Sequence, residues 1–330
     1  MTVLRWSPRV LAIAAKLALS VALMVFLFRR IPLAAVGEAL RSADRGVLLA
    51  AAALMLASNL TGAFQWSRLL NAVEIRIPLW KVCAYYHVGL FFNNFLPANI
   101  GGDIARVVDA SRYSRTRAAA LATVVMDRAL GTLALAGLAL VTSIPAIDRF
   151  HLSLAYLALV GFFLASLTFL WALFHPRFLA AVEAVMARVG LARLKPHLDE
   201  LALNLAGLRD QRGLLLRVFL IALVVQVARI GVHALVARAF GLHIELTYFF
   251  LFVPLLAVIV SLPISFNGIG VREGAGIVFF GWVGVSRTAA FSLQFTTYLV
   301  AVAVSLLGAV VFLARIPRRR AQARQPGRSS

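Results

Sequence analysis

The sequence predicts an all-α, polytopic membrane protein with about eight spans. Hydrophobic residues make up 62% of the 330 residues and charged residues only 14%, whereas soluble domains are roughly 45–50% apolar and 25% charged. The mean hydropathy is +0.90. The apolar runs are continuous and do not alternate, which favours helices over a β-barrel. We therefore expect lipid to be the main solvent of this chain.

Apolar runs that can cross a hydrocarbon core of roughly 30 Å, which takes about 20 residues, recur along the chain. The predicted full spans are 10–28, 47–66, 119–142, 152–174, 214–237, 245–263 and 288–313. The first run follows Arg5 and Arg9, as in a signal peptide, but it ends in Arg29 and Arg30 without a cleavage site of small residues. We interpret it as a retained span.

Three other regions complete the predicted organisation. Two short apolar segments, 82–97 and 271–286, are bounded by Pro and Gly. The polar stretch 175–213 carries apolar residues near helical spacing among basic ones, which is typical of amphipathic helices on the cytoplasmic membrane surface. Residues 315–330 read as a disordered basic tail, and residues 1–314 as a single transmembrane domain with two halves, 1–150 and 151–314.

The distribution of Lys and Arg predicts the orientation in the membrane. If segment 82–97 enters and leaves on one side, the cytoplasmic connections carry 21 Lys and Arg and the outer ones 7. This re-entrant arrangement places both termini in the cytoplasm of a cell (inner) membrane protein. It also explains the net charge of +20 without a nucleic-acid partner, because the basic residues flank apolar runs.

The first broken segment contains Asn94 and Pro97, followed by Gly101 and Gly102. Proline disfavours helical geometry at the preceding residue and the glycines allow tight turns, so one short helix ends and another begins here. The second helix would point free N–H groups and its positive dipole end into a polar cavity, with Arg106 one turn along, which suits a phosphate or carboxylate. Alternatively, Asp103 and Arg106 pair with each other at i,i+3 spacing.

The second broken segment repeats this pattern 166 residues later. Pro263 matches Pro97, Gly268 matches Gly102 and Arg272 matches Arg106, and the segment also contains Gly270 and Glu273. Interrupted segments at corresponding positions of two halves are the sequence signature of a transporter's central site. The alternative is that three matching positions coincide by chance.

Further charges fall within predicted spans. Asp127 and Arg128 lie near the start of one span and Arg229 lies inside another. A charge in hydrocarbon costs several kcal/mol unless it faces a partner or water, so we expect these residues to face the bundle, where the arginines could pair with Asp103, Asp127 or Glu273. The alternative for Asp127 and Arg128 is an interfacial pair that extends to the headgroups.

Taken in order, these motifs resemble a known family. The residues that carry the resemblance are Asn94, Leu96, Pro97, Gly101, Gly102, Asp103, Arg106, Asp127, Arg128, Gly131, Pro263, Gly268, Gly270, Arg272 and Glu273. They resemble the integral membrane family named for the transmembrane region of lysylphosphatidylglycerol synthase, whose members are called flippase-like. The resemblance spans about residues 10–314. It implies movement of a lipid with a charged headgroup between leaflets. It does not extend to the aminoacyltransferase domain of the two-part relatives.

The leading hypothesis is therefore a lipid transporter for a charged, phosphate-containing headgroup. Its candidate binding residues are Asn94, Pro97, Gly101, Gly102, Asp103, Arg106, Asp127, Arg128, Arg229, Gly268, Gly270, Arg272 and Glu273. A membrane-embedded enzyme with Asp103 or Glu273 as general base is the second hypothesis, and a scaffold for envelope-lipid enzymes is the third. We expect no cofactor or metal, because the sequence contains no nucleotide loop or metal-ligand spacing. The expected partner is a phospholipid or another anionic lipid.

Overall fold

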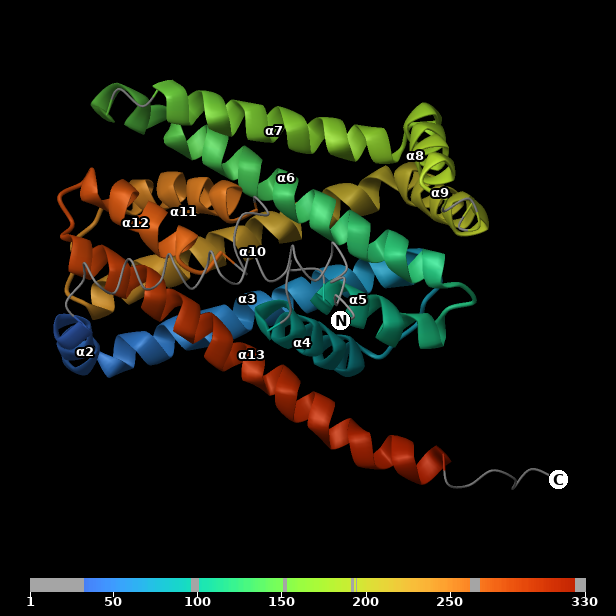
Figure 1. The fold of residues 1–330 in the computed structure, drawn as a ribbon, viewed down its shortest axis with the longest axis horizontal. Helices are drawn as coiled ribbons and strands as arrows, with labels where there is room; N and C mark the ends of the chain where they lie inside the picture. Colours follow the sequence, from blue (N-terminus) through green and yellow to red (C-terminus); the bar gives the residue numbers. More distant parts are fainter. Residues whose placement is uncertain are drawn as a thin grey trace, which may run out of the picture. The chain divides into compact units, whose positions relative to one another are not determined.

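A computed structural model describes residues 33–95, 101–150, 153–190, 193, 195–261 and 268–323. Within these residues all regular secondary structure is helical (Figure 1), which confirms the predicted all-α class. The predicted first span, 10–28, lies outside the described residues, as do Pro97 and Pro263.

The helices follow one another with short connections. Their bounds are α2 (Leu33–Ser42), α3 (Arg45–Ala72), α4 (Leu79–Phe95), α5 (Gly101–Ala110), the 3-10 turn η2 (Ser111–Tyr113), α6 (Arg117–Phe150), α7 (Ser153–Leu173), α8 (Pro176–Arg188), α9 (Lys195–Asp210), α10 (Arg212–Ala239), α11 (Leu246–Ser261), α12 (Val271–Gly281) and α13 (Arg287–Ala323).

Five helices of the described chain are long and apolar enough to cross a membrane. They are Arg45–Ala72, Arg117–Thr142, Tyr156–Leu173, Arg212–Ala239 and Arg287–Arg315, and each contains or closely matches a predicted span. The chain is thus a multi-pass membrane protein. The segment predicted as a full span at 245–263 forms the shorter helix α11, whose 16 residues end at Ser261, just before the second break. At about 1.5 Å per residue, α11 is roughly 24 Å long.

The helices form two compact units. The first takes in the described parts of Met1–Ser58, Arg128–Leu173 and Phe219–Val300, and the second those of Asn59–Asp127, Phe174–Val218 and Ala301–Ser330. The long helices α3, α6, α10 and α13 contribute residues to both units. Both predicted sequence halves also contribute to each unit, so neither unit corresponds to one half.

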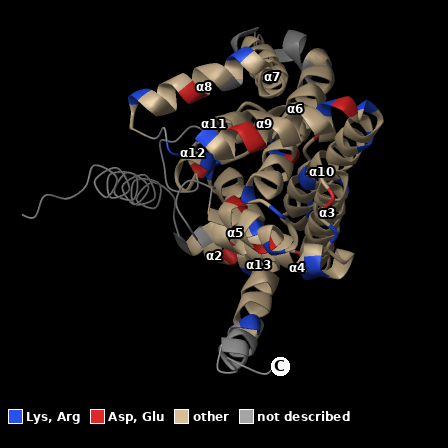
Figure 2. Ribbon diagram, turned by 90° about the vertical axis from the view of Figure 1, so that its right-hand side faces the viewer, with Lys and Arg blue, Asp and Glu red and all other residues tan. Residues whose placement is uncertain are grey.

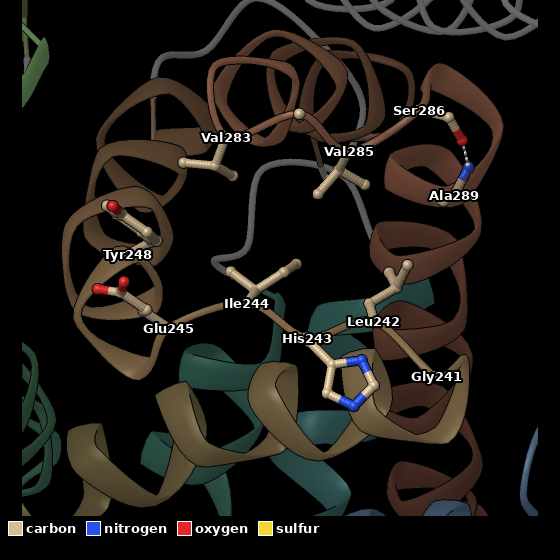
Figure 3. Close-up of a pocket in the computed structure, with 11 residues that line it drawn as sticks. Gly241, Leu242, His243, Ile244, Glu245, Tyr248, Val283, Val285, Ser286 and Ala289 are labelled. Atoms are coloured by element: carbon tan, nitrogen blue, oxygen red, sulfur yellow. Dashed lines mark hydrogen bonds between the residues drawn. The ribbon is translucent and has the colours of Figure 1, made fainter.

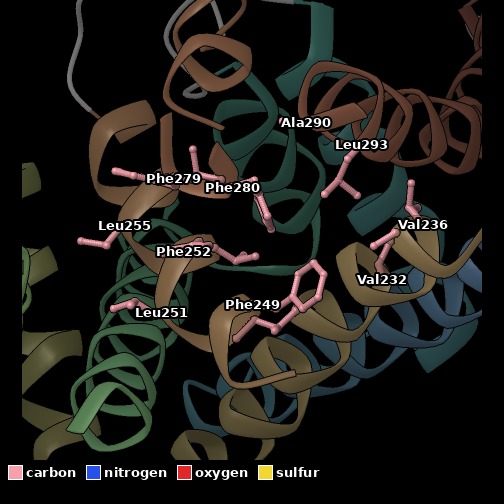
Figure 4. Packing of buried hydrophobic residues seen from close by; sticks show 14 of the residues in the cluster. Val232, Val236, Phe249, Leu251, Phe252, Leu255, Phe279, Phe280, Ala290 and Leu293 are labelled. Carbon is pink, nitrogen blue, oxygen red and sulfur yellow. The ribbon is translucent and has the colours of Figure 1, made fainter. Parts of the chain in front are cut away.

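Aromatic and aliphatic side chains hold the first unit together. Phe249 and Phe252 of α11 pack against Phe280 of α12, with ring centroids 5.5 and 5.3 Å apart, respectively. Val232 of α10 and Leu293 of α13 join the same cluster (Figure 4). Residues of α10, α11, α12 and α13 thus bury their apolar side chains on one another.

The second unit is built around the α4–α5 hairpin. Helices α4 and α5 pack along each other. Their buried apolar side chains, with those of α3 and α6, form one cluster: Ala63, Trp66, Leu70, Ile75, Ile77, Val82, Tyr85, Tyr86, Ala110, Ala119, Ala120 and Val124. Segment 82–97, predicted to enter and leave the membrane on one side, corresponds to α4, which packs on α5. Its re-entry stays a prediction.

The polar stretch 175–213 forms helices α8 and α9, which pack on each other and bury Leu205 and Leu208. The prediction of helices is confirmed, and their place on the membrane surface stays a prediction. Charged residues are visible on α5, α8 and α9, while most of the ribbon carries none (Figure 2).

Helix α13 continues to Ala323, past the predicted start of the tail at 315, since Ala, Arg and Gln favour helices.

Candidate functional site

The α4–α5 hairpin depends on two glycines at its crossing. A Cβ added to Gly102 would collide with the carbonyl oxygen of Gly89, and one added to Gly89 would lie 2.9 Å from Cγ of Arg106. The Gly102 N–H, at the start of α5, donates to Oδ1 of Asn93 at 2.8 Å. Helix α5 thus begins at Gly101, as the Pro and Gly pattern predicts, and its first turn is held against the end of α4.

Arg106 is the centre of a buried polar network in this hairpin. Its Nη2 atom donates to Oδ2 of Asp127 at 2.7 Å, and its Nη1 atom lies 3.7 Å from Oδ1 of Asp103. The guanidinium carbon lies 4.3 Å from the ring centroid of Trp66 and 4.8 Å from that of Tyr86. Two carboxylates and two aromatic faces therefore stabilise this charge inside a membrane protein.

A second layer of hydrogen bonds fixes the partners of Arg106. Oδ1 of Asp127 accepts a hydrogen bond from Nε2 of Gln65 at 2.9 Å. The indole N–H of Trp66 donates to the hydroxyl of Thr123 at 3.0 Å. The i,i+3 pairing of Asp103 with Arg106 is present, but the shorter contact is with Asp127, which the sequence analysis did not assign as the partner of Arg106.

The charged network continues along α5 toward its carboxyl end. Asp109 pairs with Arg315 at 3.1 Å and with Arg112 at 3.5 Å, and the Arg315 guanidinium lies 4.5 Å from the Tyr85 ring centroid. In η2, which follows α5, a hydrogen bond with the Tyr85 hydroxyl lowers the pKa of Tyr113 below its ordinary value of 10.0. Acidic and basic residues thus alternate every three positions from Asp103 to Arg112.

The second interrupted segment, in the first unit, uses its glycines differently. Gly268 and Gly270 have φ angles of +73° and +82°, which only glycine adopts freely. A Cβ on Gly268 would also lie 2.6 Å from Cγ1 of Val260 in α11. Helix α12 begins directly afterwards, and Arg272 and Glu273 occupy its first turn.

Glu273 and Arg272 form the polar part of this segment. Oε2 of Glu273 accepts the Gly270 N–H at 2.7 Å, while Oε1 lies 3.6 Å from Nε of Arg272. The Arg272 guanidinium carbon lies 4.3 Å from the Tyr298 ring centroid of α13. The side chain of Arg272 is 19% exposed and that of Glu273 1%. The arginine is therefore partly exposed, and its carboxylate partner is enclosed.

The remaining predicted residues lie apart from these two clusters. Asn94 donates to the Ser305 hydroxyl of α13 at 2.9 Å. Arg128 is exposed although the adjacent Asp127 is buried, and Arg229 is half-buried on α10. Arg106 and Asp127 belong to the second unit, and Arg272 and Glu273 to the first. The convergence of Arg106 and Arg272 on one cavity stays a prediction.

A separate pocket in the first unit involves none of the predicted residues. Its volume is about 370 Å³, and it lies between the α10–α11 and α12–α13 connections. Leu242, Ile244, Val283 and Val285 surround its centre, whereas the carboxylate of Glu245 points away from it (Figure 3).

Sequence reasoning missed several side chains that complete the clusters. They are Gln65, Trp66, Tyr86, Asp109, Arg112, Tyr298 and Arg315. The three-residue spacing of Asp103, Arg106, Asp109 and Arg112 was a usable signal, because side chains at i and i+3 of a helix are neighbours and can pair in succession. The aromatic residues offered none, since Trp and Tyr are common in apolar spans.

The comparison with known families decides the membership of this chain. Residues 13–309 match the family described as the Lysylphosphatidylglycerol synthase TM region. The chain belongs to this family. A relative named "UPF0104 membrane protein", from Methanothermobacter thermautotrophicus, is 28% identical over 267 residues, which is 76% of this chain and 79% of that protein. The resemblance identified from the interrupted segments is confirmed, and with it the class of multi-pass membrane proteins.

Proposed function

We propose that this protein is a lipid transporter of the flippase type, which moves a lipid with a charged, phosphate-containing headgroup between the two leaflets of the cell membrane. The observation that carries the proposal is the start of α12, where Arg272 extends from a short helix inside an apolar bundle. The membership in the lysylphosphatidylglycerol synthase TM family supports a lipid as substrate.

The chemistry of Arg272 suits a phosphate. A guanidinium offers two parallel N–H donors to two phosphate oxygens, and the Tyr298 ring, 4.3 Å from the guanidinium carbon, helps to hold this group in place. The first turn of α12 adds the positive end of the helix dipole, although the N–H groups of Gly270, Arg272 and Gly274 are already hydrogen-bonded within this segment. A charged headgroup crosses hydrocarbon only where such groups replace its water.

Of the two arginines at interrupted segments, Arg272 is the better placed to bind a ligand. The side chain of Arg106 is 6% exposed and held by two aspartates, whereas that of Arg272 is 19% exposed. In this proposal Arg106, Asp103 and Asp127 maintain the α4–α5 hairpin. Both termini are proposed to be cytoplasmic, in accord with the distribution of basic residues.

Lipid movement in vesicles tests this proposal directly. The full chain is reconstituted into phosphatidylcholine vesicles with a trace of a lipid that carries a fluorophore on one acyl chain, and dithionite quenching reports the outer-leaflet fraction. We expect labelled phosphatidylglycerol to exchange between leaflets at least about tenfold faster than in empty vesicles, and an uncharged glycosyl diacylglycerol to remain at the empty-vesicle rate.

Arg272→Gln should reduce this exchange to near the empty-vesicle rate. The matched control is Arg287→Gln, which removes an exposed arginine at the start of α13 in the same unit and should keep the wild-type rate. Equal exchange of charged and uncharged lipids, or no exchange by a folded wild-type protein, would refute the proposal. A change in lipid composition without exchange would indicate an enzyme instead.

A further inference from the structure

We propose that Glu273 is a proton-binding site, and that it takes up a proton when an anionic headgroup binds to Arg272. The two ligands would then be coupled, and one proton would accompany each headgroup. This inference rests on the proposed function for the identity of the anion, whereas the proton site itself stands on the geometry of α12.

The carboxylate of Glu273 is enclosed but incompletely bonded. The residue is 0% exposed, and its Oε2 atom accepts the Gly270 N–H. Its Oε1 atom has no hydrogen-bond partner among the described residues and lies 3.6 Å from Nε of Arg272. A buried carboxylate oxygen without a hydrogen bond is costly, and a proton on that oxygen removes the negative charge.

A second unpartnered polar group lies on the neighbouring helix. Gln294 of α13 is 0% exposed, and neither atom of its amide has a hydrogen-bond partner within the described part of the chain. Its Cδ atom lies 3.1 Å from the position that a Cβ on Gly276 would take, one helical turn after Glu273. The absence of a side chain at Gly276 thus makes room for this amide against α12. An amide oxygen is a suitable acceptor for a protonated carboxyl group.

Among the described residues, few other titratable groups lie on the helices around Glu273. On α10, His233 interacts electrostatically with Arg272, and its Nδ1 atom lies 3.1 Å from the Arg229 carbonyl oxygen. On α13, Tyr298 stacks on Arg272. Helix α11, which packs on α12, has Tyr248 as its one titratable residue. Helix α2 reaches this region through Val36, and its Glu38 and Arg41 are exposed.

The Glu273 carboxylate and the anionic headgroup compete for the Arg272 guanidinium, and this competition couples headgroup binding to protonation. Without a ligand, Arg272 is the countercharge of the Glu273 carboxylate. A bound phosphate would take over that countercharge and place a second negative charge nearby, and both effects favour protonation of a buried carboxylate. By linkage, protonation must strengthen anion binding by the same factor. The proton also cancels one negative charge of the headgroup, which lowers the cost of its passage through a low-dielectric region.

Infrared difference spectroscopy of the full-length protein in detergent tests the site without a transport assay. We expect one protonated-carboxyl band to appear as the pH is lowered when the Glu273→Gln spectra are subtracted from the wild-type spectra, because the subtraction removes the bands of the other carboxyl groups. Addition of short-chain dihexanoyl phosphatidylglycerol should move the midpoint of this band to higher pH. The matched control Glu245→Gln, an exposed carboxylate of the same unit, should leave both the band and its shift unchanged.

The lipid should also bind more tightly at low pH, by up to about tenfold for each pH unit between the two midpoints, because one proton is linked to one anion. In Glu273→Gln this pH dependence should disappear. A midpoint that the lipid does not move in wild-type protein, or no protonated-carboxyl band in the difference between the wild-type and Glu273→Gln spectra, would overturn the inference. A normal midpoint shift in a protein that moves no lipid would instead refute the proposed transport function and leave the proton site intact.

Discussion

The two interrupted segments share a sequence pattern but differ in how far their buried carboxylates are hydrogen-bonded. In the α4–α5 hairpin, Arg106 has two carboxylate partners and two aromatic rings, and Asp127 is held in turn by Gln65. At the start of α12, Glu273 has one oxygen without a hydrogen bond among the described residues. The first arrangement is typical of a structural ion pair, and the second leaves room for a ligand or a proton.

The matched glycines also serve different purposes. Gly102 lies inside α5, where its missing side chain allows contact with the backbone of α4. Gly268 precedes α12 and adopts a positive φ angle. The two segments have the same spacing in the sequence, yet their helices start at different points. Helix α5 starts five residues before Arg106, whereas α12 starts only one residue before Arg272. A match in residue type does not fix the same backbone geometry.

The largest expected effect is on the free energy of unfolding, when the ion pair of Arg106 with Asp127 is broken and compared with that of Arg272 and Glu273. Asp127→Asn should lower the free energy of unfolding by about 3 kcal/mol, because it leaves the buried Arg106 charge with Asp103 alone. Glu273→Gln should change it by less than about 1 kcal/mol, since Arg272 is partly exposed and the Gln oxygen can still accept the Gly270 N–H. Unfolding of the two variants by increasing SDS in mixed micelles measures both values. Equal losses would contradict the contrast drawn between the segments.

The crossing of α4 and α5 gives the next effect. Gly102→Ala should destabilise the protein by about 2 kcal/mol, since its Cβ would collide with the Gly89 carbonyl and force the helices apart. The control is Gly207→Ala on α9, where nothing lies within 4 Å and the helix propensity of alanine should leave stability equal or slightly higher. Thermal melting in detergent compares them. A harmless Gly102→Ala would show that the hairpin is not closely packed.

The smallest expected effect concerns the aromatic partners of the two arginines. Tyr86→Leu should cost about 1–2 kcal/mol because it removes one of the two rings that stack on a desolvated guanidinium. Tyr298→Leu should cost about 0.5–1 kcal/mol, since Arg272 is partly solvated. The same SDS titration resolves the order of the two losses, and the reverse order would argue that Arg272 is the more enclosed charge.

The sequence by itself determined the class of protein, most of its spans and the family. Long apolar runs must form helices in lipid, because no other structure there satisfies the backbone hydrogen bonds without closing into a barrel. Proline and glycine also located both interruptions, since their effects on the backbone are local. For the same reason, the start of α5 at Gly101 was predictable.

Only the tertiary structure decided the partners of each charge. Nothing local links Arg106 to Asp127, 21 positions away, or Gln294 to the face of α12, because such contacts depend on helix packing. The structure likewise decided that Arg106 is enclosed by Trp66 and Tyr86 while Glu273 keeps an unbonded oxygen. The type of a charged side chain sets which groups it can bind, and the packing of neighbouring helices determines which of these groups it contacts.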